Sequence, residues 1–170
     1  MLSFDRRRST IPPVAPSKGA ELALLLLGGF QEMVDEVVTG LAERGHPGVR
    51  AMHEFALRAI DGGADTASEL GRQLSVSKQA AAKTITALET LGYVERRADA
   101  RDARRKQLRV TPRGREMLAI GAALFDEVRE RWAHEIGDKK LQAMESQLAA
   151  LVPTQTLAVG GLTEVEDATE

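Results

Sequence analysis

Five side chains between residues 75 and 83 carry hydrogen-bonding groups at spacings that suit contact with a DNA duplex. They are Ser75, Ser77, Lys78, Gln79 and Lys83. Serine hydroxyls and a helix N-terminus suit phosphate oxygens. Glutamine can pair with adenine through two hydrogen bonds, and lysine can meet guanine or a phosphate. Any one of these residues could equally be an ordinary solvent-facing helix residue, but the set together indicates a nucleic-acid contact.

A strongly basic segment follows at residues 96–115, where nine Arg and Lys residues stand against two Asp residues. Residues 116–170 have four basic and eleven acidic residues, and the whole chain has a net charge of −2. One basic stripe on a nearly neutral protein indicates a single DNA-facing surface. A charge run of this kind is also typical of a solvated loop, and its position after two short helices favours the first interpretation.

Within the basic segment, four arginines are the candidate contacts with the DNA backbone or minor groove. They are Arg97, Arg101, Arg104 and Arg105. A narrow A·T-rich minor groove attracts arginine electrostatically, which favours Arg101 and Arg104 at the expected tip. Asp99 and Asp102 repel DNA, so we expect them to orient the neighbouring arginines through charge-assisted hydrogen bonds.

These side chains need a helix pair to position them. Thr66 and Glu69 have the spacing of a capping box and predict a short helix that runs to Leu74. Ser77 predicts the cap of the next helix, which covers residues 78–91. Gly92 suits the left-handed position that follows a helix. The sequence thus predicts two helices joined by a tight turn.

A β-hairpin and further helices are predicted around that pair. Strands are expected at residues 93–97 and 105–110, with Leu108 and Val110 facing inward. Apolar spacing and turn residues predict helices at residues 20–44, 49–60, 112–136 and 139–152. Asp138 is expected to cap the last of these helices. The apolar face of the helix at 112–136 is predicted to consist of Leu118, Ala122, Phe125, Val128 and Trp132.

The chain resembles the MarR family of bacterial transcription regulators (multiple antibiotic resistance regulator). The resemblance is carried by ELGRQLSVSKQAAAKTITALETLGYVERR and by the hairpin sequence DARDARRKQLRVTPRG. The Asp-x-Arg-Asp-x-Arg pattern of that family stands as Asp99, Arg101, Asp102 and Arg104. The Leu-Thr-x-x-Gly pattern that follows it appears with Val110 in the place of leucine.

The resemblance implies a mainly α-helical fold with a small β-hairpin wing, in which a winged helix-turn-helix is joined to a helical dimerisation lobe. The DNA-binding lobe would span residues 46–111, and the dimerisation lobe would combine residues 18–45 with 112–152. Residues 1–17 would form a flexible arm and residues 153–170 an acidic tail. The implied function is a homodimeric repressor of a palindromic operator in double-stranded DNA. A small aromatic or lipophilic effector would relieve repression.

Several other functions are disfavoured by the residues that the chain lacks. There is no cysteine, which excludes disulfides, thiolate–zinc sites and thiol redox sensing. No apolar run reaches membrane-spanning length and no secretory signal is evident, so we expect a cytoplasmic protein. No catalytic constellation is evident, which argues against an enzyme, and no cofactor is expected.

The three histidines are not expected to bind a metal. His46 is expected to shape a loop, whereas Met52 and His53 are the candidates for lining an effector cavity where the first, second and fifth helices meet. A rival function is a winged-helix scaffold for protein interaction without DNA reading, although such domains usually lack a basic wing.

Overall fold

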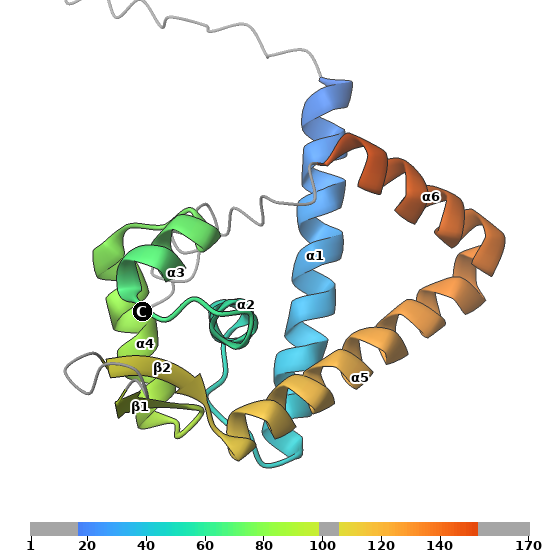
Figure 1. Cartoon of the computed structure of the whole chain (residues 1–170). Coiled ribbons are helices and arrows are strands. Elements are labelled where there is room, and N and C mark those ends of the chain that lie inside the picture. The colour runs from blue at the N-terminus through green and yellow to red at the C-terminus, as the bar shows by residue number, and fades with distance from the viewer. Residues whose placement is uncertain (1–16, 99–105, 153–170) are drawn as a thin grey trace, which may run out of the picture. The chain divides into compact units, whose positions relative to one another are not determined.

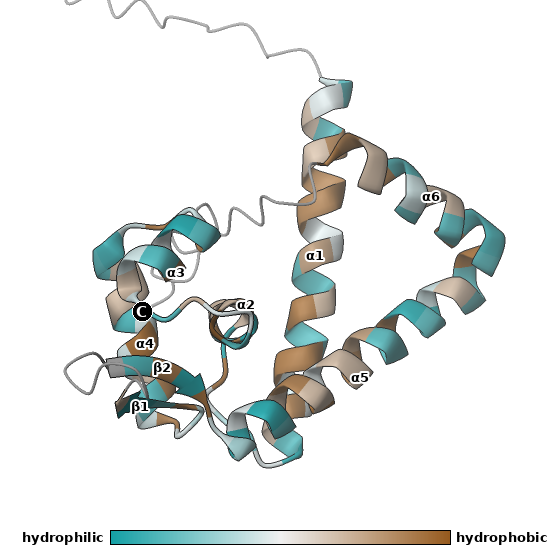
Figure 2. Cartoon of the chain, viewed as in Figure 1, coloured by the Kyte–Doolittle hydropathy of each residue, from teal (hydrophilic) through white to brown (hydrophobic). Residues whose placement is uncertain are grey.

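The computed structural model describes residues 17–98 and 106–152, and the chain divides into two units, Met1–Glu32 and Met33–Glu170. The boundary falls inside helix α1 (Lys18–Glu43). Ser17 caps this helix, because its Oγ accepts a hydrogen bond from the Ala20 amide at 3.3 Å. In the first unit, α1 exposes a run of leucines, seen as brown turns in Figure 2. Their exposed fractions range from 37% at Leu27 to 68% at Leu25.

The second unit contains the remaining elements, labelled in Figure 1. They are α2 (Ala51–Asp61), α3 (Ala67–Leu74), α4 (Lys78–Thr90), β1 (Val94–Ala98), β2 (Lys106–Val110), α5 (Pro112–Ile136) and α6 (Asp138–Leu151). The two strands pair antiparallel, with Val94 opposite Val110. The fold is therefore mainly helical with one β-hairpin, which confirms the predicted fold class.

One hydrophobic core holds α2, α3, α4 and the hairpin together. Leu57, Leu70, Ile85, Leu88 and Tyr93 are almost completely buried in it. Leu108 and Val110 face inward, as the alternation in the second strand predicts. Burial of a large aliphatic side chain stabilises a fold by about 1.5–3 kcal/mol, so this core fixes the three helices relative to the hairpin.

The predicted apolar face of α5 is correct only in part: Val128 is buried, and Leu118 and Phe125 pack against the core while partly exposed. The buried residues of α5 are Gly114, Met117, Gly121, Leu124 and Val128. Four of the five predicted residues are only partly buried, and Val128 alone is shared. Two glycines belong to the buried stripe, and at Gly114 neighbouring groups come too close for a larger side chain. A Cβ at Gly114 would lie 2.4 Å from the Tyr93 carbonyl oxygen.

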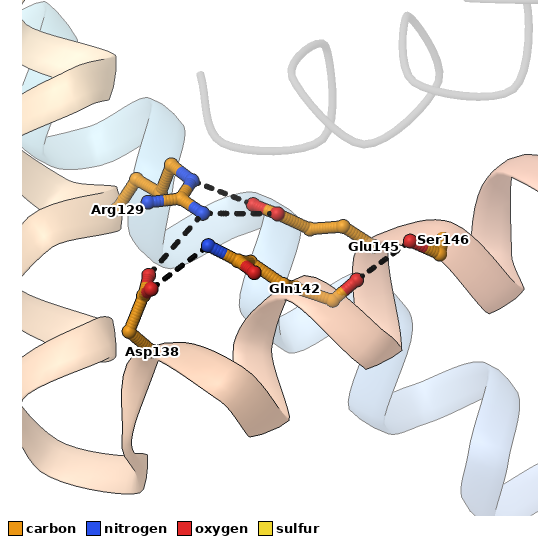
Figure 3. A network of polar contacts seen from close by, with 5 residues as sticks. All are labelled: Arg129, Asp138, Gln142, Glu145 and Ser146. Atoms are coloured by element: carbon orange, nitrogen blue, oxygen red, sulfur yellow. Dashed lines mark hydrogen bonds and ion pairs between the residues drawn. The ribbon is translucent and has the colours of Figure 1, made fainter.

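The predicted capping role of Asp138 is also wrong. Gly137 stands at the N-cap of α6 without a side-chain bond, and Asp138 is the first residue of the helix. Its carboxylate instead accepts a hydrogen bond from Gln142 Nε2 at 2.8 Å and lies 3.7 Å from Arg129 Nη2 (Figure 3). Arg129 also donates to both carboxylate oxygens of Glu145, at 2.7 and 3.0 Å. This network joins α5 to α6.

Candidate nucleic-acid interface

The turn between α3 and α4 is tight because its backbone approaches α3 closely. A Cβ at Gly71 would lie 2.9 Å from the Val76 carbonyl oxygen. Ser75 adopts a left-handed conformation with φ 56°. Ser77 then caps α4, since its Oγ accepts a hydrogen bond from the Ala80 amide at 3.1 Å. A serine hydroxyl that accepts this bond still has a proton to donate to a phosphate.

The exposed face of α4 gathers the side chains that the sequence singles out. Ala81, Ile85 and Leu88 face the core, which turns the opposite side of the helix outward. That outward face consists of Lys78, Gln79, Ala82, Lys83 and Thr86, and Ser75 and Ser77 are exposed beside it. Helix α4 contains one acidic residue, Glu89, and Arg96 Nε donates to its carboxylate at 2.8 Å. The face is thus cationic and rich in donors.

The hairpin beside α4 is described only up to Ala98 and again from Lys106. Arg97 is exposed and lies in an ion pair with Glu95, with Nε 2.6 Å from Oε1. Exposed pairs of this kind contribute about 0–1 kcal/mol, so Arg97 can exchange its partner for a phosphate at little cost. The other wing candidates, which are Asp99, Arg101, Asp102, Arg104 and Arg105, lie outside the described residues.

A polar cluster around the buried His46 and Tyr93 holds the base of the hairpin. His46, between α1 and α2, lies 3.1 Å from the Tyr93 hydroxyl through its Nδ1 atom. The Arg113 guanidinium, at the start of α5, lies 5.4 Å from the centroid of the Tyr93 ring and donates to the Gly45 carbonyl at 2.8 Å. Glu116 approaches the other His46 nitrogen at 3.9 Å. The cluster therefore joins the hairpin base to α5 and to the α1–α2 loop.

Burial shifts the pKa values of this cluster. Loss of water lowers the pKa of His46, and Arg113 lowers it further, while Glu116 opposes both effects. Burial likewise raises the pKa of the Tyr93 hydroxyl. His46 is therefore neutral near pH 7 and forms an uncharged hydrogen bond with Tyr93. The sequence predicts that His46 shapes its loop, and the hydrogen bond to Tyr93 is a contact that can do so. No local sequence pattern could have predicted Tyr93 as the partner, because the two residues are far apart in the chain.

His53 and Met52 lie in different surroundings although they are neighbours. Met52 belongs to the hydrophobic core. His53 lines a groove with Arg50 on one side and α4 on the other, where Gln79 and Lys83 are also lining residues. His53 Nδ1 accepts a hydrogen bond from the Arg50 amide at 3.2 Å. Burial lowers the pKa of His53, and the charge of Arg50 lowers it further.

A separate small cavity lies where α1, α2 and α5 meet. It is lined by Val34, Val37, Val38, Leu41, Val49, Arg50, Ala51, Glu54, Phe55 and Phe125. Glu54 is buried, and Arg58 Nη2 donates to its Oε1 atom at 2.6 Å. Gly121 of α5 lies beside this carboxylate, where a Cβ would make an ordinary contact of 3.4 Å with Glu54 Oε1. Neither Met52 nor His53 is among the lining residues.

Metal-binding clusters and membrane-spanning helices are both absent from the described residues. No group of three or more His, Asp or Glu side chains in that part of the chain has an arrangement that could hold a metal ion. Of the helices at 18–43, 51–61, 67–74, 78–90, 112–136 and 138–151, none is sufficiently long and apolar to cross a bilayer.

The order and geometry of these elements define a winged helix-turn-helix protein with additional long helices. Residues 48–105 match the family model described as the MarR family, which confirms the predicted resemblance. No curated protein matches the chain.

Three solved structures illustrate the likeness of fold. A MarR-family transcriptional regulator from Rhodococcus sp. RHA1 is 20% identical with a TM-score of 0.61, and the match covers 82% of this chain and 100% of that one. CouR from Rhodococcus jostii RHA1, bound to p-coumaroyl-CoA, is 20% identical with a TM-score of 0.59, covering 84% and 99%. A mutant of S. aureus MepR bound to an oligodeoxyribonucleotide is 17% identical with a TM-score of 0.53, covering 76% and 94%.

The two buried histidines predict a pH-dependent stability. Their pKa values are lowered in the folded protein, so below the unfolded value of about 6.5 the unfolded chain binds protons that the folded chain does not. The free energy of unfolding should therefore fall as the pH decreases from about 7 to 5. Urea unfolding at several pH values would measure this. His53→Asn should show a smaller dependence, and an identical dependence in both proteins would contradict the assignment of His53.

Proposed function

We propose that this protein is a homodimeric transcription repressor that binds a palindromic operator and is released from it by a small aromatic or lipophilic effector. The observation that carries the proposal is the exposed face of α4, which presents Gln79 and two lysines without a free carboxylate on the same helix. A helix with this surface, capped by an exposed Ser77, suits the major groove. Such a protein would act in the cytoplasm.

The basic hairpin supports the same function. Residues 96–115 hold nine basic residues, and Arg97 at the end of β1 is exposed. We propose that Arg101, Arg104 and Arg105 contact the minor groove or the DNA backbone, and that Asp99 and Asp102 orient them. In a two-fold symmetric dimer, two such lobes would read half-sites about 34 Å apart, which is one turn of the duplex.

The exposed leucines of α1 support the proposed dimer. Leu22, Leu25 and Leu26 lie on one side of the helix, at three- and four-residue spacing, and are between 47% and 68% exposed. A contiguous apolar patch of this kind on a single chain is typical of a surface that another protein covers. On this basis α1 contributes to the contact between two copies, together with the helices at 112–152 that the sequence assigns to the dimerisation lobe.

Leu25→Glu should therefore dissociate the dimer without unfolding the monomer. A charge placed inside an apolar interface loses its hydration, and this cost weakens association by several kcal/mol over two symmetric contacts. Sedimentation or light scattering would measure the mass of the particle. Gln31→Glu is the matched control, because it adds the same charge to an exposed position of the same helix. A Leu25→Glu protein that stays dimeric would place the interface elsewhere.

The small cavity at the junction of α1, α2 and α5 is the proposed effector site. Its lining is apolar except for Arg50 and the buried Glu54. The cavity has a volume of about 10 Å³, which holds about one water molecule, so an aromatic effector would have to move the three helices apart in order to bind there. One relative of the same fold, CouR, has p-coumaroyl-CoA bound. A tenfold loss of operator affinity requires about 1.4 kcal/mol of coupling, so the effector must bind the DNA-free form more tightly by that amount.

Selection of duplexes from a random-sequence pool tests the proposed function. The full chain should enrich a palindromic site with half-sites about one helical turn apart. The logarithm of its affinity for the selected duplex should fall steeply with the logarithm of salt concentration, because each phosphate contact releases counterions. Failure to enrich any sequence, together with a flat salt dependence, would favour the alternative, a winged-helix protein-interaction scaffold without sequence-specific DNA binding.

A further inference from the structure

An open groove runs between the start of α2 and the recognition helix α4, and no motif in the sequence points to it. We call it the α2–α4 groove. It is lined by Gly48, Arg50, His53, Gln79, Ala82, Lys83, Thr86, Ala87, Thr90 and Leu91. Gln79, Ala82, Lys83 and Thr86 also belong to the exposed face of α4. The groove is therefore continuous with the surface that we assign to the major groove.

The charges of the α2–α4 groove have one sign. Arg50 supplies a positive charge from the residue before α2, and Lys83 supplies another from α4. No Asp or Glu is among the lining residues, and Glu54 of α2 and Glu89 of α4 form ion pairs with Arg58 and Arg96. Two cations with no carboxylate between them attract an anion.

His53 adds an uncharged hydrogen-bond donor. Because its Nδ1 atom accepts the Arg50 amide proton at 3.2 Å, the ring proton of the neutral imidazole lies on Nε2. The lowered pKa of His53 keeps the ring neutral near pH 7. His53 Nε2 is the remaining polar atom of this side chain, and it can donate to an oxygen in the groove.

The threonines of the groove do not add donors. Thr86 Oγ1 donates to the Ala82 carbonyl at 3.1 Å, and Thr90 Oγ1 donates to the Thr86 carbonyl at 2.9 Å. The donors available to a ligand are thus the side chains of Arg50, His53, Gln79 and Lys83. Four donors with two positive charges match the oxygens of a phosphodiester.

We propose that the α2–α4 groove binds a backbone phosphate of the DNA, next to the bases that α4 reads, and that Arg50 and His53 are DNA contacts outside the helix-turn-helix. This inference rests on the proposed function. The groove is open along α4 rather than enclosed, which suits a continuous strand that passes beside the helix. Contacts of this kind set the orientation of α4 on the duplex and carry no base preference.

The test measures salt dependence with a duplex that the wild-type protein selects from a random-sequence pool. Arg50→Gln removes one charge from each subunit and should lower the affinity about tenfold. It should also reduce the slope of log affinity against log salt by about 1.8, because the dimer loses two phosphate contacts and each accounts for about 0.9 of the slope. Arg50→Lys keeps the charge and should keep the slope. Lys139→Gln, which removes a charge from an exposed position of α6, is the matched control and should change neither quantity.

His53→Asn separates the hydrogen bond from the charge. The Asn amide oxygen can take over the acceptor role of Nδ1 toward the Arg50 amide, whereas the Nε2 donor is lost. Its affinity should fall severalfold while its salt slope stays that of the wild type. A methylphosphonate scan of the duplex adds a measurement on the wild-type protein. One neutralised phosphate per half-site should weaken wild-type binding and leave Arg50→Gln binding unchanged.

The outcomes distinguish the two proposals. If the wild-type protein enriches no duplex, the proposed function fails. If it binds with a steep salt slope that Arg50→Gln leaves unchanged, or if no phosphate shows the expected coupling to Arg50, the groove is not a phosphate site while the proposed function stands. If Arg50→Gln binds the selected duplex as tightly as the wild-type protein, Arg50 makes no phosphate contact and the inference is overturned.

Discussion

Gly114→Ala should destabilise the protein by about 1–3 kcal/mol, although alanine is the better helix former. The new Cβ would lie 2.4 Å from the Tyr93 carbonyl oxygen and 2.8 Å from Val110 Cγ1. The same Tyr93 oxygen accepts the Thr111 amide at 2.9 Å, so the backbone cannot withdraw without loss of that bond. The gain in helix propensity, about 1 kcal/mol, is smaller than the cost of moving the hairpin base away from α5.

Urea unfolding of Gly114→Ala and of the wild type would measure the difference. Gly28→Ala is the matched control, since no neighbouring group lies within 4 Å of the position that a Cβ would take there, and α1 exposes this site. That variant should be as stable as the wild type or slightly more stable. A Gly114→Ala protein with an unchanged free energy of unfolding would mean that α5 and β1 are less closely packed than the structure indicates.

Arg104→Ala should produce the largest loss of operator affinity of any single substitution in the hairpin. One well-made arginine contact contributes about 1–3 kcal/mol, and a dimer loses two of them. The expected decrease in affinity is therefore roughly thirtyfold or more, with folding and dimerisation unchanged. Arg101→Ala should have a smaller effect. The choice of these two arginines rests on the sequence pattern, since residues 99–105 lie outside the described residues.

Titration of the selected duplex at fixed salt would measure both variants. Lys140→Ala provides the control, because Lys140 is an exposed cation of α6, outside the lobe that we assign to DNA binding. It should retain most of the affinity. If Arg104→Ala and Arg101→Ala both bind as tightly as the wild type, the hairpin has no part in DNA binding.

Local sequence patterns were sufficient to predict most elements of the fold. The Thr66 and Ser77 caps, the positive φ of Gly92 and the threonine–proline start of α5 all depend on residues within one helical turn of each other. Hydrogen bonds between residues that are close together in the chain can be predicted from the types and spacing of those residues. The alternation in β2 is of the same kind, because Leu108 and Val110 share one face of a strand.

Contacts between distant segments could not be predicted in this way. The buried stripe of α5 includes Gly114 and Gly121, which apolar spacing ignores, and their burial follows from Tyr93 and Glu54. His46 and Tyr93 meet only after the core has formed. The same is true of His53, which α2 places beside Lys83 of α4. Each of these arrangements depends on how whole helices cross, which no spacing in the sequence records.

The contacts between α6 and α5 decide how easily α6 detaches from the rest of the protein. Leu141 is the only buried side chain of α6, and the ion pairs of Arg129 with Glu145 and Asp138 lie at the surface (Figure 3). Exposed ion pairs weaken as salt screens them, whereas apolar burial does not. In a single copy of the chain, α6 should therefore detach before the core unfolds. A second copy of the chain that covers Met144 and Leu151 would hold α6 in place. Dilution separates the two copies and high salt weakens the ion pairs, so both would promote detachment of α6.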